Sequence, residues 1–149
     1  MSGLDHVIDL EAVRQRLVAD LGQSVRKVEL LADIEAVMQA RVIMVPAVYV
    51  VPGTERAQEM GSIALAQRVR ASFGLLLLVR NAGDTQGGAV LGGGLRDLRS
   101  ACLRSLQGWV MDEATGEPVA HQDGRVLRMA PGGYVMWVDA YAVTHYRGL

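Results

Sequence analysis

Residues 66 to 81 constrain the fold more than any other part of the sequence. In their first half apolar and polar side chains alternate, which would place Val69, Ala71 and Phe73 on one face of a strand and Arg68, Arg70 and Ser72 on the other. From Leu75 to Val79 every residue is apolar, which is typical of a strand that is covered on both faces. The pattern predicts one long central strand without chemically reactive groups, and it favours a protein that works by shape and contact.

Chain length, net charge and cysteine count limit the class of protein. A chain of 149 residues is long enough for one domain, 1–149, that buries about two thirds of the surface it exposes when unfolded. Its 15 basic and 16 acidic side chains give a net charge of -1, so no overall field attracts nucleic acid or an anionic membrane. The single cysteine, Cys102, excludes an internal disulfide and favours a reducing, cytoplasmic environment.

Neither a signal peptide nor a membrane span is expected. Charged residues are spread through the start of the chain, which leaves no apolar core for a signal peptide. The longest uncharged apolar run, from Val42 to Pro52, contains two prolines and is far shorter than the roughly 20 residues that span a bilayer. We therefore expect a soluble protein.

Three elements are predicted in the first part of the chain. Asp9 is suited to cap a helix that ends at Gly22 and has its apolar residues at Leu10, Val13, Leu17 and Leu21. Residues 25 to 31 alternate charged and apolar side chains, as a strand with one wet face does. Asp33 is suited to cap a second helix over residues 34 to 41, with Ile34, Val37 and Met38 toward the core.

The next strand is expected to begin at Ala47, because Pro46 cannot donate to a ladder, and to end before Pro52-Gly53. Residues 53 to 63 show no period and lie between two strong strands. A connection this long in a compact domain is usually functional or mobile. Because only this loop joins them, the strand from Ala47 and the strand over residues 66 to 81 are expected to be antiparallel.

The main helix is predicted over residues 91 to 107. Its apolar residues recur at intervals of three or four, at Leu91, Leu95, Leu98, Cys102 and Leu106. The expected outer side carries Arg96, Arg99 and Ser100. The glycines at positions 92 to 94 indicate either loose first turns or a close approach of another backbone.

The end of the chain is predicted to be a hairpin, a turn and a long strand. Asp123-Gly124 favours the positive φ angles of a tight turn, so residues 118–122 and 125–129 would form the hairpin. After a second turn at residues 131–133, the strand over residues 134–146 matches residues 66–81 in length and apolar character, and we expect the two side by side. The predicted class is α+β, with a single sheet that is mostly antiparallel or mixed and is flanked by helices.

No residue pattern indicates catalysis, a cofactor or a metal ion. The glycines of residues 87–94 precede a helix, as a phosphate-binding loop does, but the Lys and the Ser or Thr that such a loop requires are missing. The histidines, His6, His121 and His145, are scattered without metal-ligand spacing. Cys102 falls in the apolar stripe of the main helix, where a thiol acts as a small hydrophobe.

Two charged features have structural interpretations. Asp139 interrupts an apolar strand, so we expect an ion pair or hydrogen bond, inside the fold or with a neighbouring subunit, rather than work as a general base. One face of the strand over residues 66–81 carries Arg68, Arg70 and Arg80, which could touch phosphates. Without interleaved aromatic residues, such arginines are more often solvated or form interface salt bridges.

Several segments follow one another in a specific order. They are Pro46-Ala-Val-Tyr-Val-Val-Pro52, residues 67–81, residues 95–109 with their Gly-Trp ending, Pro118-Val-Ala, Gly124-Arg-Val-Leu and Trp137-Val-Asp-Ala-Tyr141. In this order they resemble the phage tail terminator family of Mu-like and other long-tailed phages and prophages. The resemblance covers about residues 46 to 147, and the glycines at positions 92–94 depart from it, since an alanine-rich helix would be expected there.

The resemblance implies a virion assembly protein that is not an enzyme. Such a protein forms a ring, typically six-fold, on the end of the completed tail tube, stops tube polymerisation and presents the surface that docks to the head or neck. The implied partners are further copies of the chain, the tail tube protein and the head or neck connector protein. DNA would pass the lumen without specific binding, and the protein would move from the host cytoplasm into the tail or neck of the virion.

Two polar segments are the candidate contacts with other subunits or with the tube. One is the loop over residues 53–62, which we expect to become ordered on contact, together with the arginines at its base, and the other is residues 112–117. The expected interface residues are Thr54, Glu55, Arg56, Gln58, Glu59, Arg68, Arg70, Asp112 and Glu113. The alternative is a small ligand-binding or enzymatic domain with a pocket between the sheet and the main helix, for which Cys102 and Asp139 are the inward polar groups.

Overall fold

A computed structural model describes residues 8–31, 34–39, 44–58, 66–80, 93–113, 116–130 and 132–148. The elements in these ranges are α1 (Leu10–Leu21), η2 (Gly22–Ser24), β1 (Lys27–Leu30), α2 (Ile34–Met38), β2 (Ala47–Ala57), β3 (Ala66–Arg80), α3 (Leu95–Leu106), β4 (Ala120–Ala130) and β5 (Tyr134–Gly148). The strands form one sheet in the order β1-β2-β3-β5-β4, with only the β1–β2 pair parallel. The expected α+β class with a mostly antiparallel, mixed sheet is confirmed.

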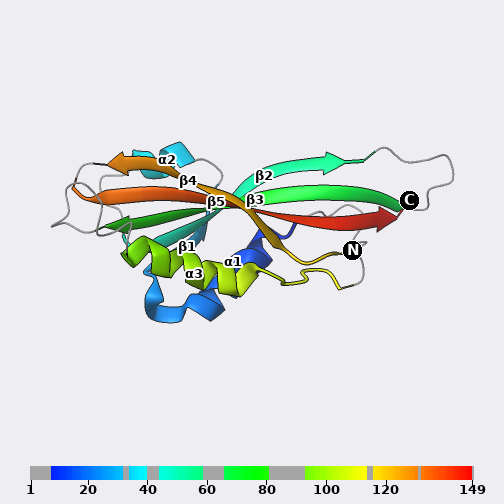
Figure 1. Ribbon diagram of the computed structural model, residues 1–149, viewed down its shortest axis with the longest axis horizontal. Coiled ribbons are helices and arrows are strands. Elements are labelled where there is room, and N and C mark those ends of the chain that lie inside the picture. Colours follow the sequence, from blue (N-terminus) through cyan, green and yellow to red (C-terminus); the bar gives the residue numbers. More distant parts are fainter. Residues whose placement is uncertain are drawn as a thin grey trace.

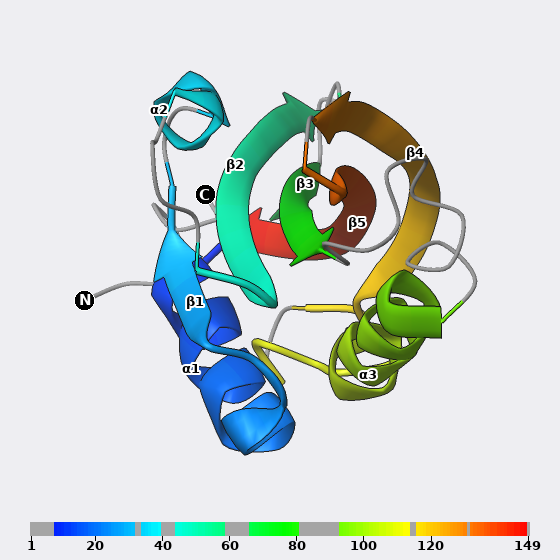
Figure 2. The same ribbon diagram turned by 90° about the vertical axis from the view of Figure 1, so that its left-hand side faces the viewer.

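The helices lie on two sides of this sheet. Figure 1 shows the sheet as a long twisted ribbon, with α1 and α3 below it and α2 above it at one end. Figure 2 looks along the strands and shows the same separation of α1 and α3 from α2. None of the helices in the described ranges has the length and apolar character needed to cross a bilayer.

β3 is the centre of the sheet, as the sequence predicts. It pairs with β5 along its whole length, from Ala66 opposite Gly148 to Arg80 opposite Tyr134. Residues 75–79 are all buried, while in the first half Val69, Ala71 and Phe73 are buried and Arg68 and Arg70 are exposed. The predicted neighbour relation of the two long strands is therefore confirmed.

α1 begins and ends as its sequence predicts. The Asp9 carboxylate accepts a hydrogen bond of 3.1 Å from the Ala12 backbone N–H, which satisfies one of the free donors at the helix start. Gly22 follows the last turn with a φ of 55°, a conformation that glycine adopts without steric cost. The residues buried by α1 are Val13, Leu17 and Leu21.

β1 and α2 are shorter than predicted. In β1 Val28 is buried, whereas Leu30, which the alternation placed beside it on the inner face, is 43% exposed. α2 has five residues, with Val37 buried and Ile34 packed against the same cluster. Asp33, residues 40–41 and the side chain of Met38 lie outside the described residues.

The predicted end of β2 before Pro52 is wrong. The strand continues to Ala57, with Pro52 opposite Phe73 and a bulge before Glu55. β1 accompanies β2 only as far as Val50, so the continuation of β2 has an uncovered edge, where a residue without an N–H is tolerated. Residues 53–57 are therefore strand and not loop, while residues 59–63 lie outside the described part of the chain.

The hairpin predicted around Asp123-Gly124 is also wrong. Residues 120–130 form a single strand, β4, which pairs with β5 and absorbs two register shifts. Gly124 lies opposite Asp139 in this pairing and serves close packing rather than a turn. The turn predicted after it is present, with φ angles of 85° at Gly132 and 82° at Gly133 leading into β5.

α3 carries the predicted apolar stripe. Leu95, Leu98, Cys102 and Leu106 are buried, and Leu91 lies outside the described residues. Apart from chain neighbours and the backbone of the same helix, no atom of the described residues lies within 4 Å of where a Cβ would stand on Gly93 or Gly94, so no close approach of a described backbone segment explains these two glycines.

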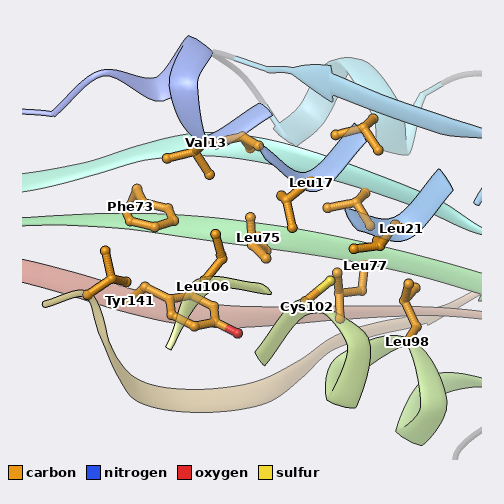
Figure 3. Packing of buried hydrophobic residues seen from close by; sticks show 14 of the residues in the cluster. Val13, Leu17, Leu21, Phe73, Leu75, Leu77, Leu98, Cys102, Leu106 and Tyr141 are labelled. Carbon is orange, nitrogen blue, oxygen red and sulfur yellow. The ribbon is translucent and has the colours of Figure 1, made fainter. Parts of the chain in front are cut away.

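The core has one layer on each face of the sheet. The larger layer joins α1 and α3 to the sheet, and Figure 3 shows α1, the central strands and α3 contributing side chains to it. Its labelled members are Val13, Leu17, Leu21, Phe73, Leu75, Leu77, Leu98, Cys102, Leu106 and Tyr141. The smaller layer lies on the α2 side and contains Val37, Ala47, Tyr49, Leu76, Leu78 and Met136.

Candidate assembly surface

One end of the sheet extends away from the helices. There the strands are β2 from Gly53 onward, β3 up to Ser72 and β5 from Val143 onward, and we call these three segments the arm. In Figure 1 they run to the right, beyond the three helices, while the helix-covered part of the sheet lies to the left. The arm brings together most of the interface residues that the sequence predicts.

An arginine face covers the arm on its α2 side. Arg56 on β2 lies directly opposite Arg70 on β3, and Arg68 lies opposite Tyr146 on β5. Directly opposite residues share a face of a sheet, and this face is the reverse of the one on which Val69 is buried. The side chains of Arg56, Arg68 and Arg70 are all exposed. We use the name arginine face for these three residues.

Thr54 and Glu55 of the first segment are built into β2, and Gln58 follows the end of this strand. The Thr54 N–H donates to Ser72 Oγ at 2.9 Å, and the two hydroxyl oxygens are 3.1 Å apart. Glu55 lies opposite Ala71, on the face of the sheet that α1 and α3 cover in the body. The Gln58 N–H donates to the Arg68 carbonyl at 2.9 Å, and Glu59 lies outside the described residues.

The second predicted segment lies along the outer side of β5. The Glu117 N–H donates to the Thr144 carbonyl at 2.8 Å, and Gly116 forms a bridge with His145. The exposed acidic residues of this segment are Asp112, Glu113 and Glu117, and we call them the acidic segment. The described parts of the two predicted segments, residues 53–58 and residues 112, 113, 116 and 117, thus lie on opposite sides of the arm.

The body of the domain holds a buried charge cluster that the sequence reveals only in part. Arg99 of α3 donates two hydrogen bonds to Asp139 of β5, from Nε to Oδ2 at 3.0 Å and from Nη2 to Oδ1 at 2.8 Å. His121 Nε2 lies 2.9 Å from Asp139 Oδ1 and must donate, since an ionised carboxylate can only accept. The prediction that Asp139 is paired is confirmed, with both partners supplied by the same chain.

Electrostatics keep Asp139 ionised. Burial alone would raise its pKa, because only 2% of its side chain is exposed, but the hydrogen bonds from Arg99 and His121 hold the pKa below its usual range. The Arg99 guanidinium also stacks 4.5 Å from the centroid of the Trp137 ring. Arg99 was expected on the outer side of its helix; instead, its long side chain reaches back to the sheet.

Gly124 makes room for this cluster. A Cβ on this residue would stand 2.3 Å from Asp139 Oδ1, 2.8 Å from Arg99 Nη2 and 3.0 Å from Trp137 Cζ2. Real Cβ atoms do not approach other atoms so closely, so any side chain here would displace the ion pair. The residue that sequence reasoning assigned to a turn is required by a carboxylate on the neighbouring strand.

A cavity of about 520 Å³ lies between α3 and the sheet, where the alternative function would need it. Its polar lining is richer than the sequence indicated, because Arg99 and His121 join Asp139 there. These three groups bind one another, however, and so stabilise the fold. The sequence gives no local sign that Arg99, next to the apolar stripe of its helix, and His121, on an edge strand, contact a carboxylate.

The remaining reactive residue types are equally unsuited to chemistry. Cys102 is fully buried, and this burial, with the nearby Asp139 charge, raises the pKa of its thiol to about 12. A nucleophilic cysteine needs the opposite shift. The Cys102 thiol is therefore unsuited to act as a nucleophile. Within the described ranges, no group of three His, Cys, Asp or Glu side chains could hold a metal ion.

Comparisons with known proteins indicate the family of the chain. A family model described as "Phage tail terminator protein" matches residues 4–149. A comparison with curated protein sequences finds no match. Among solved structures, the chain is similar to one from the virion of a native gene transfer agent (GTA) particle, with a TM-score of 0.54 and 14% identity over 92% of this chain and 93% of that chain. At this identity the similarity concerns the fold alone.

Proposed function

Because the chain belongs to the phage tail terminator family, we propose that it closes into a ring on the end of the finished tail tube. There it stops tube polymerisation and presents the surface that joins the tail to the head or neck. The observation that carries this proposal is the family match over residues 4–149, which spans nearly the whole chain. The family is structural, so the protein is a virion component and not an enzyme.

The arm supports the ring. A head-to-tail ring needs two different, mutually complementary patches on each subunit, whereas a two-fold dimer uses one patch twice. The arm has two such sides, with the arginine face on β2 and β3 and the acidic segment beyond β5. We propose six subunits to a ring, and contacts that include Thr54, Glu55, Arg56, Gln58, Glu59, Arg68, Arg70, Asp112 and Glu113.

The proposed partners follow from the place of such a ring. One side of the ring would bind the last layer of the tail tube protein, and the other would bind the head or neck connector protein. DNA would pass through the lumen without specific contacts. The chain from the gene transfer agent virion has the same fold, which supports a place in a virion particle. The proposed course is assembly in the host cytoplasm and a final place in the tail or neck of a phage or prophage particle.

Purified protein and isolated tail tubes test the proposal. We expect native mass spectrometry to detect closed rings, either of the protein alone or after tubes are added, and electron microscopy to find the protein at one end of the tube. Tubes capped in this way should no longer grow when tube protein is supplied. A strict monomer that neither binds tube ends nor complements a terminator-deficient phage would contradict the proposal.

A further inference from the structure

The arm carries opposite charge on its two sides. The arginine face, on β2 and β3, has three guanidinium groups, and the acidic segment beside β5 has three carboxylates. The whole chain has a net charge of only -1, so this separation is a local arrangement and does not follow from the composition. β5 lies between the two groups.

No acidic side chain in the described part of the chain forms an ion pair with the arginine face. Arg56 and Arg70 are direct cross-strand partners, and like charges in this position destabilise a sheet. Arg70 donates a hydrogen bond to the neutral Gln122 amide oxygen, and neither Arg56 nor Arg68 forms an ion pair with any carboxylate that the structure describes. Glu55 is the nearest acidic residue along β2, and it lies on the other face.

In the body of the same sheet, a buried charge is paired within the chain. There Arg99 and Asp139 meet within one chain, with His121 as a further donor. A domain that pairs its buried Asp139 with an arginine of the same chain, yet holds three exposed arginines together on its arm, is suited to receive acidic groups from another molecule at that place.

We propose that the arginine face of one copy binds the acidic segment of the next copy, so that neighbouring arms join head to tail. This inference rests on the proposed function. It assigns the two sides of the arm to the two halves of one heterologous contact. Like-to-like contact of two arginine faces would be repulsive, so the same charges also fix the order of the subunits.

A second copy fits this face better than nucleic acid does. Phosphates would be attracted by Arg56, Arg68 and Arg70, but the acidic segment beside the same arm would repel a polyanion that runs across it. The acidic segment instead provides the matching partner on every copy of the chain. Binding to DNA is therefore an outcome that the experiment must be able to detect.

Two charge-reversed forms of the full chain test the pairing. The first form is Arg56→Glu with Arg70→Glu, and the second is Glu113→Lys with Glu117→Lys. The matched control is Arg125→Glu with Arg128→Glu, which makes the same charge change at exposed positions of β4, away from the arm. Self-association of each form is measured by sedimentation velocity and native mass spectrometry, alone and on isolated tube ends, and folding is checked by thermal unfolding.

We expect each reversed form to self-associate at least about tenfold more weakly than the original chain, since close charge pairs at interfaces are coupled by that much or more. Mixing the two forms should restore association, because in an alternating ring every contact again joins opposite charges. The control should associate like the original chain. Restoration by mixing also proves that both forms are folded, since an unfolded chain could not restore it.

Each of the following results would overturn the pairing. If rings still form with both charge reversals, the pairing is wrong, while the proposed function stays intact. Weakening without restoration on mixing, or an equal weakening in the control, would show that no specific pairing exists. An unmodified chain that never self-associates, even on tube ends, would overturn the pairing and the proposed function together. If the first form loses binding to a duplex DNA fragment while its self-association is unchanged, the arginine face binds nucleic acid.

Discussion

The two halves of β3 lie in different environments. Residues 75–79 are buried on both faces, between the layer under α1 and α3 and the layer under α2. Residues 66–72 keep one face buried through Val69 and Ala71, while the other face carries Arg68 and Arg70 in solvent. One strand therefore serves as the centre of the core at one end and as a support for an exposed surface at the other.

This contrast shows where the constraints on the sequence lie. In the body, apolar burial and the internal pairing of Asp139 determine stability, so substitutions there should be costly. On the arm, the exposed face contributes little to stability and can be shaped by contacts with other molecules. Substitutions along the two regions should separate these two kinds of constraint.

The largest effect is expected for Leu77→Ala in the body. Leu77 is fully buried, so removing its side chain should lower the free energy of unfolding by about 2–5 kcal/mol. The matched change on the arm, Arg68→Ala, should stay within about 0.5 kcal/mol, because its side chain is exposed. Urea unfolding measures both. Similar losses for the two variants would mean that the arm is as much a part of the stable core as the body is.

The next effect is expected for Asp139→Ala. It leaves the Arg99 guanidinium and the His121 ring without their acceptor, and breaking a buried pair in this way is strongly destabilising. Because the Arg99 side chain is 36% exposed and can turn to water, we expect a loss of about 2–3 kcal/mol, below the range for fully buried pairs. A loss under about 0.5 kcal/mol in urea unfolding would show that the cluster does not hold α3 on the sheet.

A smaller effect is expected for Gly124→Ala. The new methyl group would collide with Asp139 Oδ1 and with Arg99, so we expect a loss of about 1–3 kcal/mol from overpacking. Gly94→Ala is the control, since Gly94 has helical angles and free space around its Cβ position. It should stabilise the chain by about 0.4–1 kcal/mol. Equal responses of the two glycines in thermal unfolding would contradict the close-packing role of Gly124.

The pH dependence of stability tests the cluster of Arg99, Asp139 and His121 without removing a side chain. Because the pKa of Asp139 is lowered by folding, its contribution is present above its unfolded pKa, about 3.9, and is lost as the pH falls through the folded pKa. Stability measured by urea unfolding between pH 5 and pH 2 should therefore fall more steeply for the original chain than for Asp139→Asn. Parallel curves would show that the carboxylate is not specifically stabilised as an anion.

These residues also show what the sequence could predict about the fold. The alternation and apolar run of β3, the cap of α1 and the stripe of α3 depend on near neighbours, and the structure confirms all three. The turn predicted at Asp123-Gly124 failed because it was judged from local turn chemistry. The conformation there is that of a strand paired with β5, which places Gly124 opposite Asp139.

The candidate site was predictable only as a set of polar segments. The sequence singled out residues 53–62 and 112–117, but the placement of their described residues on opposite sides of one arm depends on the pairing of β2, β3 and β5. The bulge after Pro52, which lets β2 continue, was likewise hidden, because a Pro-Gly pair usually ends a strand. Arg99 and His121 could not be assigned to Asp139 without the same pairing.

The smallest and most discriminating effect is expected for Arg56→Glu. It turns the like-charged cross-strand pair with Arg70 into an opposite-charged one, which should stabilise the free chain by about 0.2–1 kcal/mol. The same change removes a cation from the arginine face, so assembly should weaken while the monomer becomes more stable. Arg125→Glu, which changes the charge equally on β4 without such a partner, should move neither property. Thermal unfolding and sedimentation measure the two readouts, and a variant that loses stability and assembly together would show that Arg56 serves the fold and not the contact between copies.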